Sequence, residues 1–377
     1  MHELMHNLVE KRGSKLDRMK ELDLAFGMPS RDYRKIHVAG TNGKGSVSTK
    51  IASALTALGY KTGLYTSPHI NTFHERVQID GKMISVEEAS FFLRKILEIS
   101  KDATFFEVLT MLAFLYFQTK NVDFAVIETG LGGTLDPTNI INPELSVITS
   151  ISFDHMNLLG STLDEIAENK AGIIKPNTGV VLGYRAALDP VLKKAVLERS
   201  PIYILPPEAD WIEENTNIAK KAVSLLFPSA QNLDFSILPP CRFEILERDG
   251  LPIIFDIAHN EDGLKKLFSK LEKTYPGRKI FTIFGMSQDK CIDFAIPFLK
   301  NRAAEIFPFD VENPRIMRRA DLANLLDSTW DDLDNFIKLA DAKNGIVLIT
   351  GSAYIMQAAK EAIFKPLLLG GSALSFH

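Results

Sequence analysis

The chain is predicted to be an α/β protein with two domains. Three observations support this: a length of 377 residues, apolar runs that alternate with amphipathic helical patterns, and a break at Pro239-Pro240. A chain of this length exceeds one ordinary hydrophobic core. Strands that alternate with helices favour a mostly parallel sheet covered on both faces. We therefore expect one domain at 1–240 and a second at 241–377.

The first domain is predicted to be the larger, a mostly parallel sheet with flanking helices. Its predicted strands are Lys35–Ala39, Asp123–Glu128, Leu145–Ile151, Gly179–Leu182 and Pro201–Leu205. Its predicted helices are 47–58, 105–118 and 162–171. Apolar residues recur at helical spacing in the first of these helices, and Gly59 supplies a stop. Thr162 and Glu165 are spaced as a capping box for the third.

The second domain is predicted to be a smaller, Rossmann-like α/β domain. It follows LPPCRFEILERDG, a segment that we interpret as rich in turns. Its predicted strands are Ile253–Ile257, Lys279–Phe284, Glu305–Phe309 and Ile346–Thr350. Its predicted helices lie near 261–273, 290–300, 319–328 and 353–362. Two α/β domains joined by a short linker favour a ligand site in the cleft between them.

The composition excludes several classes of protein. A net charge of −4 and a pI near 6.1 argue against a broad nucleic-acid surface. No apolar stretch is long enough to cross a bilayer, and the N-terminus lacks the apolar core of a signal peptide. Only two cysteines, Cys241 and Cys291, argue against a disulfide framework. We expect a cytoplasmic protein with small-molecule ligands, without nucleic-acid or membrane partners.

Residues 35–49, KIHVAGTNGKGSVST, predict a phosphate-binding loop between a strand and a helix. Gly43 and Gly45 would let the backbone approach a phosphate at a helix N-terminus, where the dipole favours anions. Lys44 would add positive charge, and Ser46 a hydroxyl for magnesium. The loop is shorter than G-x-x-x-x-G-K-[ST], because Gly45 separates Lys44 from Ser46. A glycine-rich turn with a solvated lysine is the alternative, but the flanking strand and helix favour phosphate binding.

Two further predicted strands of the first domain end in polar residues. Glu128 precedes a glycine loop and either points into a ligand crevice or is a solvated strand end. The G-L-G-G that follows is weak as a dinucleotide fingerprint, because Pro137 interrupts the segment. Asp154-His155 could supply a metal ligand, a general base or a helix N-cap. Magnesium prefers oxygen, so Asp154 is chemically the more obvious ligand, but a structural role for the pair is favoured.

Three other segments carry candidate functional groups. Lys170 lies in the last turn of a predicted helix, where a lysine complements the dipole. Thr104 and Glu107 are spaced as a capping box, and the phenylalanines between them could also stack on a flat ring. In the second domain, Asp256 at a strand end could hold a ribose or position a substrate amine. The segments Gly285–Lys290 and Gly351–Tyr354 follow two further predicted strands and would line the same edge of the sheet as Asp256.

These motifs occur in one order along the chain: HVAGTNGKGSV, TSPHI, ERVQIDG, TFFEVLTMLAF, ETGLGGTLDPTN, ITSISFDH, KAGIIK, DIAHN and GSAYIM. The order resembles the folylpolyglutamate synthases and bifunctional dihydrofolate synthases of the Mur ligase family, over nearly the whole chain. The resemblance implies a two-domain, Mur-ligase-like fold and an ATP-dependent amide ligase of folate biosynthesis. ATP would phosphorylate the carboxylate of dihydropteroate, a reduced folate, or both. The amine of L-glutamate would then attack the acyl phosphate.

The resemblance also implies a role for individual residues. The ATP-binding residues would be Thr41, Asn42, Gly43, Lys44, Gly45, Ser46, Asn215, Arg242 and Asp256. Two magnesium sites would be built from Ser67, Glu128, His155 and Lys170, with the lysine carboxylated to a carbamate. The pteroate or folate site would be bordered by Thr104, Phe105, Phe106, Glu107, Leu135, Asp136 and Pro137. The catalytic residues would be Lys44, Lys170, His155 and His259, the last near the incoming glutamate. The enzyme would be a monomer.

The sequence departs from the family pattern at a few positions. In the loop G-L-G-G-R-L-D-A-T-N, Thr134 replaces arginine and Pro137 replaces alanine. Cys241 replaces the glycine of P-G-R, and Cys291 replaces the last residue of D-K-D. These positions bear on the folate form accepted and on how glutamate is held.

Two other functions remain open at this point. One is a Mur-type ligase for a different acid; about 34 residues precede the first predicted strand, which argues against the extra N-terminal domain of cell-wall ligases. The other is a nucleotide-binding regulator without catalysis. The joint presence of Lys44, Glu128, His155 and Lys170 argues against a regulator.

Overall fold

A computed structural model describes residues 16–288, 290 and 292–368 of the chain. The described residues up to Pro239 belong to one unit, and those from Pro240 belong to a second. The family departure at Cys291 and the apolar C-terminal end from residue 369 lie outside the described residues. Each unit is described by itself.

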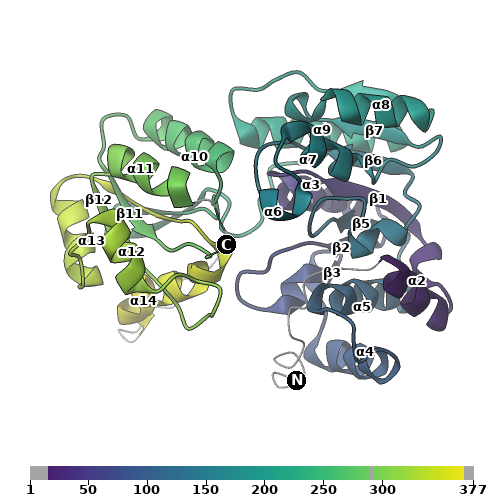
Figure 1. Cartoon of the computed structure of the whole chain (residues 1–377), viewed down its shortest axis with the longest axis horizontal. Coiled ribbons are helices and arrows are strands. Elements are labelled where there is room, and N and C mark those ends of the chain that lie inside the picture. The colour runs from purple at the N-terminus through teal and green to yellow at the C-terminus, as the bar shows by residue number, and fades with distance from the viewer. Residues whose placement is uncertain (1–15, 289, 291, 369–377) are drawn as a thin grey trace. The chain divides into compact units, whose positions relative to one another are not determined.

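The first unit is built on an eight-stranded sheet (Figure 1). In chain order its strands are β1 (Arg34–Ala39), β2 (Thr62–Tyr65), β3 (Val77–Ile79), β4 (Lys82–Met83), β5 (Phe124–Glu128), β6 (Leu145–Ile148), β7 (Gly179–Leu182) and β8 (Ile202–Ile204). Their spatial order is β4-β3-β2-β5-β1-β6-β7-β8. All neighbours from β2 to β8 pair in parallel, while β3 and β4 form an antiparallel edge. The carboxyl ends of β5, β1 and β6 therefore meet at one edge of the sheet.

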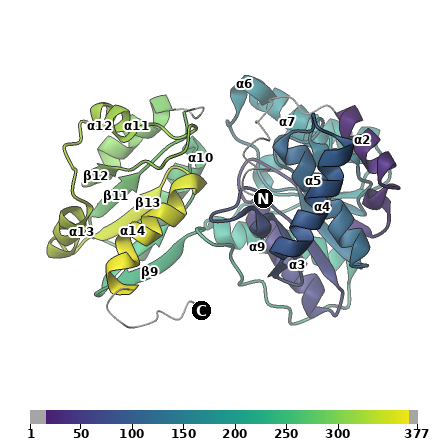
Figure 2. The ribbon, with the colours of Figure 1, turned by 90° about the horizontal axis from the view of Figure 1, so that it is seen from below.

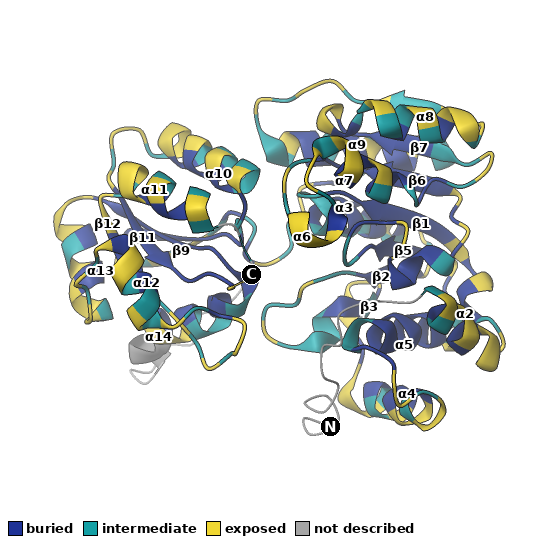
Figure 3. Ribbon diagram, viewed as in Figure 1, coloured by how far each residue is buried: buried dark blue, intermediate teal, exposed yellow. Residues whose placement is uncertain are grey.

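Helices cover both faces of this sheet. They are α2 (Leu16–Ala25), α3 (Lys44–Ala57), α4 (Val86–Ile99), α5 (Phe105–Thr119), α6 (Met156–Leu159), α7 (Leu163–Ala171), α8 (Asp189–Leu197) and α9 (Trp211–Leu226). Alternate residues of β5 face opposite sides: Phe124 and Val126 join the core under α3 and α9, whereas Ala125 and Ile127 join the core under α5. A third core, under α7 and α8, contains Ile148. Figure 3 shows the buried strands between their partly exposed helices.

The second unit is built on a five-stranded sheet. Its strands are β9 (Glu244–Arg248), β10 (Leu251–Phe255), β11 (Ile280–Phe284), β12 (Glu305–Pro308) and β13 (Ile346–Thr350), in the spatial order β12-β11-β13-β10-β9. Its helices are α10 (Glu261–Thr274), α11 (Ile292–Arg302), α12 (Arg319–Leu326), α13 (Leu333–Ala342) and α14 (Met356–Leu368). Only β9 is antiparallel to its neighbour. Figure 2 shows α14 lying along one face of this sheet.

The predicted α/β class and mostly parallel sheets are confirmed. The predicted strands at 179–182 and 346–350 have the observed bounds. The turn-rich interpretation of LPPCRFEILERDG is wrong over five residues, because Glu244–Arg248 forms β9. Asp249 and Gly250 join β9 to β10 with φ of 54° and 84°, the left-handed pair of a tight hairpin. The strand predicted to reach Ile151 ends at Ile148, where the chain leaves the sheet to contact the loop after β1.

Helix α5 provides a test of how far the first unit depends on its core. Phe114 is fully buried in α5, whereas Phe91 on α4 is 50% exposed. We expect Phe114→Ala to lower the free energy of unfolding by about 3–5 kcal/mol, since it leaves a cavity. The same change at Phe91 should cost less than about 1 kcal/mol. Denaturant unfolding of both variants measures the difference, and equal losses would contradict the packing described here.

Candidate functional site

The loop after β1 is held against the loop after β6. The Thr41 backbone N–H donates to the Ser150 carbonyl at 2.7 Å, and the Thr149 hydroxyl donates to the Asn42 carbonyl at 2.6 Å. A Cβ on Gly40 would lie only 2.0 Å from the Thr149 Oγ1. The backbone of the predicted phosphate loop is therefore fixed by two polar residues that follow β6, and Gly40 is required for this close approach.

The loop then enters α3 through Gly43, which has φ of 87° and no side-chain cap. Lys44 is the first residue of the helix, and its Nζ donates back to the Thr41 carbonyl at 3.3 Å. Ser46 is buried in the first turn. Loop backbone N–H groups and a lysine therefore gather at the N-terminus of a fourteen-residue helix, an arrangement suited to phosphate.

Asn215 of α9 lies directly against this loop. A Cβ on Gly43 would be 2.4 Å from the Asn215 Oδ1. Asn215 is buried, although it is about 170 residues from the loop in sequence. The structure thus brings this predicted nucleotide-binding residue beside the phosphate loop, through the packing of α9 on α3.

Glu128, at the end of β5, is paired with the loop after β2. Its Oε2 accepts a hydrogen bond from the Ser67 backbone N–H at 3.0 Å. Glu128 is buried, so it is not the solvated strand end that the sequence left open. Two of the predicted magnesium ligands, Ser67 and Glu128, are therefore neighbours.

Lys170, in the last turn of α7, is also buried. Its Nζ donates to the Gly40 carbonyl at 3.0 Å, so the side chain reaches the start of the phosphate loop. Complementing the helix dipole, the role that spacing favoured, does not require burial. A lysine almost never lies buried without a specific partner, and this one is directed at the candidate site.

The glycine loop, residues 130–137, lies between the end of α7 and the start of α5. A Cβ on Gly133 would be 2.7 Å from the Lys170 carbonyl oxygen, and one on Gly130 would be 2.3 Å from the Phe106 ring. The Thr134 backbone N–H and hydroxyl both donate to the Asn169 carbonyl, at 2.8 and 2.9 Å. The glycines of this segment are therefore explained by close packing, without a dinucleotide.

Asp136 organises the glycine loop from within. Its Oδ2 accepts from the Leu131 N–H at 2.8 Å, and its Oδ1 accepts from both the backbone and the hydroxyl of Thr138. Burial raises the pKa of the Asp136 carboxyl, although these hydrogen bonds oppose the rise. Pro137 is buried too, while Leu135 is 61% exposed. Of the three predicted pterin contacts here, only Leu135 exposes its side chain.

The capping box predicted at Thr104 and Glu107 is confirmed. The Glu107 N–H donates to the Thr104 Oγ1 at 3.2 Å, and the Thr104 N–H donates to the Glu107 Oε2 at 2.7 Å. The Glu107 Oε2 also pairs with Arg18 at 2.9 Å. Between these caps, the Phe106 ring lies over Gly130. The segment therefore starts a helix and also contacts the glycine loop.

His155 is the N-cap residue directly before the short helix α6, with φ of 50°. Its backbone N–H donates to the Asp154 Oδ1 at 2.9 Å, and its Nε2 is 3.8 Å from the same oxygen. The cap position belongs to His155 and has no side-chain cap, so the alternative of an Asp154 N-cap is wrong.

In the second unit, Asp256 lies near enough to Arg242 to interact with its charge. Asp256 follows β10 and accepts from the Phe243 and Ala258 backbone N–H groups, both at 2.8 Å. Burial raises the pKa of the Asp256 carboxyl, and the positive charge of Arg242 opposes the rise. The His259 Nδ1 is 2.9 Å from the Ile257 carbonyl oxygen. Asp256 and His259 thus follow the end of β10, and Arg242 comes shortly before β9, whose first residue pairs with the last residue of β10.

Sequence reasoning missed three residues that shape the first unit's site. Thr149 and Ser150 hold the phosphate loop, and Asn169 holds the glycine loop. The signal for the first two was present: a polar pair directly after an apolar strand in a parallel sheet. Asn169 carries no such signal, because its role depends on the approach of a distant loop.

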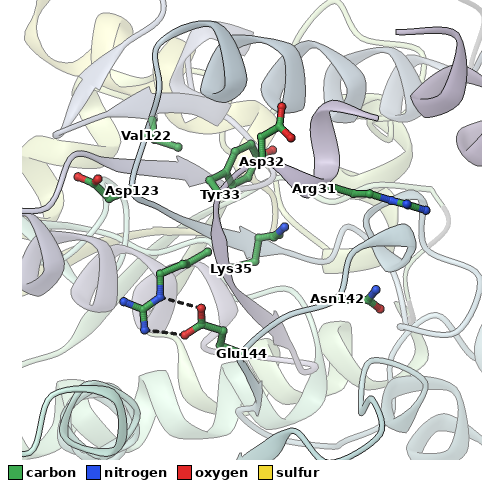
Figure 4. Close-up of a pocket in the computed structure, with 9 residues that line it drawn as sticks. Arg31, Asp32, Tyr33, Lys35, Val122, Asp123, Asn142 and Glu144 are labelled. Atoms are coloured by element: carbon green, nitrogen blue, oxygen red, sulfur yellow. Dashed lines mark hydrogen bonds and ion pairs between the residues drawn. The ribbon is translucent and has the colours of Figure 1, made fainter. Parts of the chain in front are cut away.

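A groove of about 530 Å³ lies at the opposite edge of the first sheet (Figure 4). It is lined by the start of β1, including Arg34 and Lys35, and by Glu144 before β6. Arg34 forms two hydrogen bonds to Glu144, both at 2.7 Å, and the Lys35 Nζ donates to the Ser30 carbonyl. The charged groups of Arg34 and Lys35 thus already have hydrogen-bond partners in the protein. The groove lies at the amino ends of the strands. It is therefore separate from the candidate site.

The donor set fits a magnesium ion shared with a substrate. Across residues 16–288, 290 and 292–368, no three His, Cys, Asp or Glu side chains are grouped to hold a metal. Glu128 is a single buried carboxylate at the strand edge, with Ser67 bonded to it. Magnesium commonly takes one or two carboxylates and completes its shell with water and substrate phosphates.

Within the described part of the chain, no helix is long and apolar enough to cross a membrane.

Comparison with known proteins relates both units to domains of the Mur ligases. Family models match residues 38–221 as "Mur ligase middle domain" and residues 241–353 as "Mur ligase, glutamate ligase domain". A Bacillus subtilis dihydrofolate synthase/folylpolyglutamate synthase is 33% identical over 92% of this chain and 94% of its own.

Two solved structures are also similar. Escherichia coli FolC in complex with DHPP and ADP has a TM-score of 0.86 at 25% identity, covering 97% of this chain and 98% of its own. A bifunctional folylpolyglutamate synthase/dihydrofolate synthase with Mn, AMPPNP and L-glutamate bound has a TM-score of 0.82 at 26% identity, covering 94% and 95%.

Proposed function

The chain belongs to the Mur ligase family, among the dihydrofolate synthase/folylpolyglutamate synthases, and we propose that it joins L-glutamate to a pterin-containing acid using ATP. Such relatives are ATP-dependent ligases. The observation that carries the proposal is the strand–loop–helix at Gly40–Ser46. It supplies backbone N–H groups and Lys44 at the edge where Glu128 and Lys170 also lie.

In this reaction, ATP transfers its γ-phosphoryl group to the carboxylate of the acid, leaving ADP. The amine of glutamate attacks the acyl phosphate, loses a proton and displaces phosphate, which forms the amide. Lys44 and the N–H groups at the start of α3 would offset charge on the transferring group. The residues Thr41 to Ser46 and Asn215 would hold ATP from the first unit. Arg242 and Asp256 are the proposed ATP-binding residues of the second unit.

Bound magnesium would offset negative charge on the phosphates, and two sites are proposed. Glu128 and Ser67 would hold one ion, because they already lie together. Lys170 and His155 would contribute to the second. The Lys170 ammonium would first lose one proton to give the amine. Addition of CO₂ to this amine, with loss of a second proton, would give an anionic carbamate whose oxygens can hold a metal ion. The direction of Lys170 toward Gly40 supports this role.

The acid would lie along the start of α5 and the glycine loop. Phe105 and Phe106 would contact its flat ring, with Thr104, Glu107, Leu135, Asp136 and Pro137 around them. Packing of Phe106 on Gly130 supports this, since it joins the two predicted segments. His259 would lie near glutamate in the second unit. We further propose a monomeric, cytoplasmic enzyme without nucleic-acid or membrane partners, consistent with a net charge of −4.

ADP release measured with each acid tests the function directly. We expect turnover with L-glutamate plus dihydropteroate, plus tetrahydrofolate, or plus both, and little ADP release when the acid is omitted. Mass spectrometry should show the acid heavier by one glutamyl residue. Intact ATP binding without turnover on either acid would overturn the proposal and leave a ligase for another acid or a regulator.

Two glycine variants test the phosphate loop. Gly43 and Gly59 both have positive φ, 87° and 89°, but a Cβ meets Asn215 only at Gly43 and meets nothing within 4 Å at Gly59. Each alanine substitution should cost about 1–2 kcal/mol of stability through backbone strain. Only Gly43→Ala should also weaken ATP binding, by at least about tenfold, because the close-packed loop must move. Equal ATP affinity of the two variants, measured by calorimetry, would remove the loop from the nucleotide site.

Lys170→Ala tests the carbamate. We expect activity to fall by about 10–100-fold or more, as for loss of a group that supports a metal. Added acetate should restore part of it by supplying an oxygen donor. Lys193, exposed on α8, gives the matched control: Lys193→Ala should keep full activity and should not respond to acetate. A Lys170→Ala enzyme as active as the parent would refute the proposed role.

A further inference from the structure

A buried histidine in the first sheet has no part in the proposed reaction. His37 lies in the middle of β1 and is fully buried. Its Nε2 is 2.8 Å from the Thr138 Oγ1. Thr138 belongs to the 3₁₀ turn Pro137–Ile140, directly after the glycine loop. Burying a polar side chain in a sheet core costs free energy unless the side chain is hydrogen-bonded. The contact with Thr138 offsets this cost.

The direction of each hydrogen bond follows from counting protons. Asp136 accepts from the Leu131 and Thr138 backbone N–H groups, as a carboxylate does. The Thr138 hydroxyl donates its one proton to the Asp136 Oδ1 at 2.5 Å. It can then only accept from His37. His37 must therefore carry a proton on Nε2.

The other ring nitrogen agrees with a neutral imidazole. The His37 Nδ1 is buried and has no hydrogen-bond partner within the described residues. Protonation there would leave a charged N–H group unpaired. Burial and the nearby positive charge of Lys175 lower the pKa of His37 to about 3. At neutral pH the His37 ring is therefore uncharged and donates a single hydrogen bond.

His37, Thr138 and Asp136 form a chain of two hydrogen bonds, called the relay below, which ends on the glycine loop. Through Leu131, Asp136 fixes the loop between Phe106, which lies on Gly130, and the end of α7, which lies on Gly133. A shift of the loop would therefore disturb both the proposed acid site and the surroundings of Lys170.

We propose that His37 and Thr138 are positioning residues for the acid substrate, acting through Asp136 on the glycine loop. The inference rests on the proposed function, since the acid is taken to bind along this loop. Both side chains are fully buried, so neither would touch the substrate. Their effect should appear in the KM for the acid, with the KM for ATP unchanged.

Thr138→Val removes the hydroxyl and keeps the shape of the side chain. We expect the KM for the acid to rise about tenfold, as for an unsatisfied buried group, with kcat changed by less than about twofold. Thr138→Ser should restore the parent KM. The matched control is Thr282→Val, because Thr282 is fully buried in β11 and its hydroxyl has no partner within the described residues. An unchanged acid KM in Thr138→Val, or equal changes in both valine variants, would overturn the proposal.

Nuclear magnetic resonance of the parent enzyme tests the relay without a variant and without turnover. The His37 ring should show a protonated Nε2 and an unprotonated Nδ1, with no titration between pH 5 and 8. A proton on Nδ1, or titration in that range, would refute the relay. This measurement separates the two hypotheses: an enzyme inactive on both acids would overturn the proposed function, while the ring still reports on the relay.

Discussion

The structure of the first unit depends on the hydrogen bonds that join the loop after β1 to the loop after β6. Thr149 and Ser150 hold Asn42 and Thr41 at the carboxyl edge of the sheet. Once these bonds are made, Gly40 must lie against Thr149, and its carbonyl is presented to Lys170. A short glycine loop would otherwise sample many conformations. The fixed shape of this loop is what would prepare the N-terminus of α3 for the proposed phosphate.

Buried carboxylates serve a common purpose in both units. Asp136 and Asp256 each accept two hydrogen bonds from backbone N–H groups, and Glu107 caps α5. An unpaired buried carboxylate would be strongly destabilising. Donors from several segments can satisfy it only in one arrangement. The carboxyl oxygens of these acids therefore hold loops and a helix start in place, and the assignment of Asp136 and Glu107 to substrate contact stays a prediction.

Local patterns predicted those features that local chemistry decides. The Thr104–Glu107 cap and the strand at 179–182 needed only neighbouring residues to specify them, and both are confirmed. The β9–β10 hairpin had an Asp249-Gly250 signal, but its flanking strand alternates between half-buried and exposed residues and was interpreted as turns. Half-buried edge strands lack the continuous apolar run that marks the central strands.

By itself, the sequence determined the α/β class, the strand–loop–helix at Gly40–Ser46 and the family resemblance, because strand–helix alternation and contiguous motifs depend on neighbouring residues. Only the tertiary structure decided which distant residues meet. Asn215 reaches Gly43 through packing of α9 on α3, and Lys170 reaches Gly40 through packing of α7 against the sheet. The proton position on His37 likewise follows from a threonine about 100 residues away in sequence. Such contacts depend on how elements pack, and no local pattern encodes them.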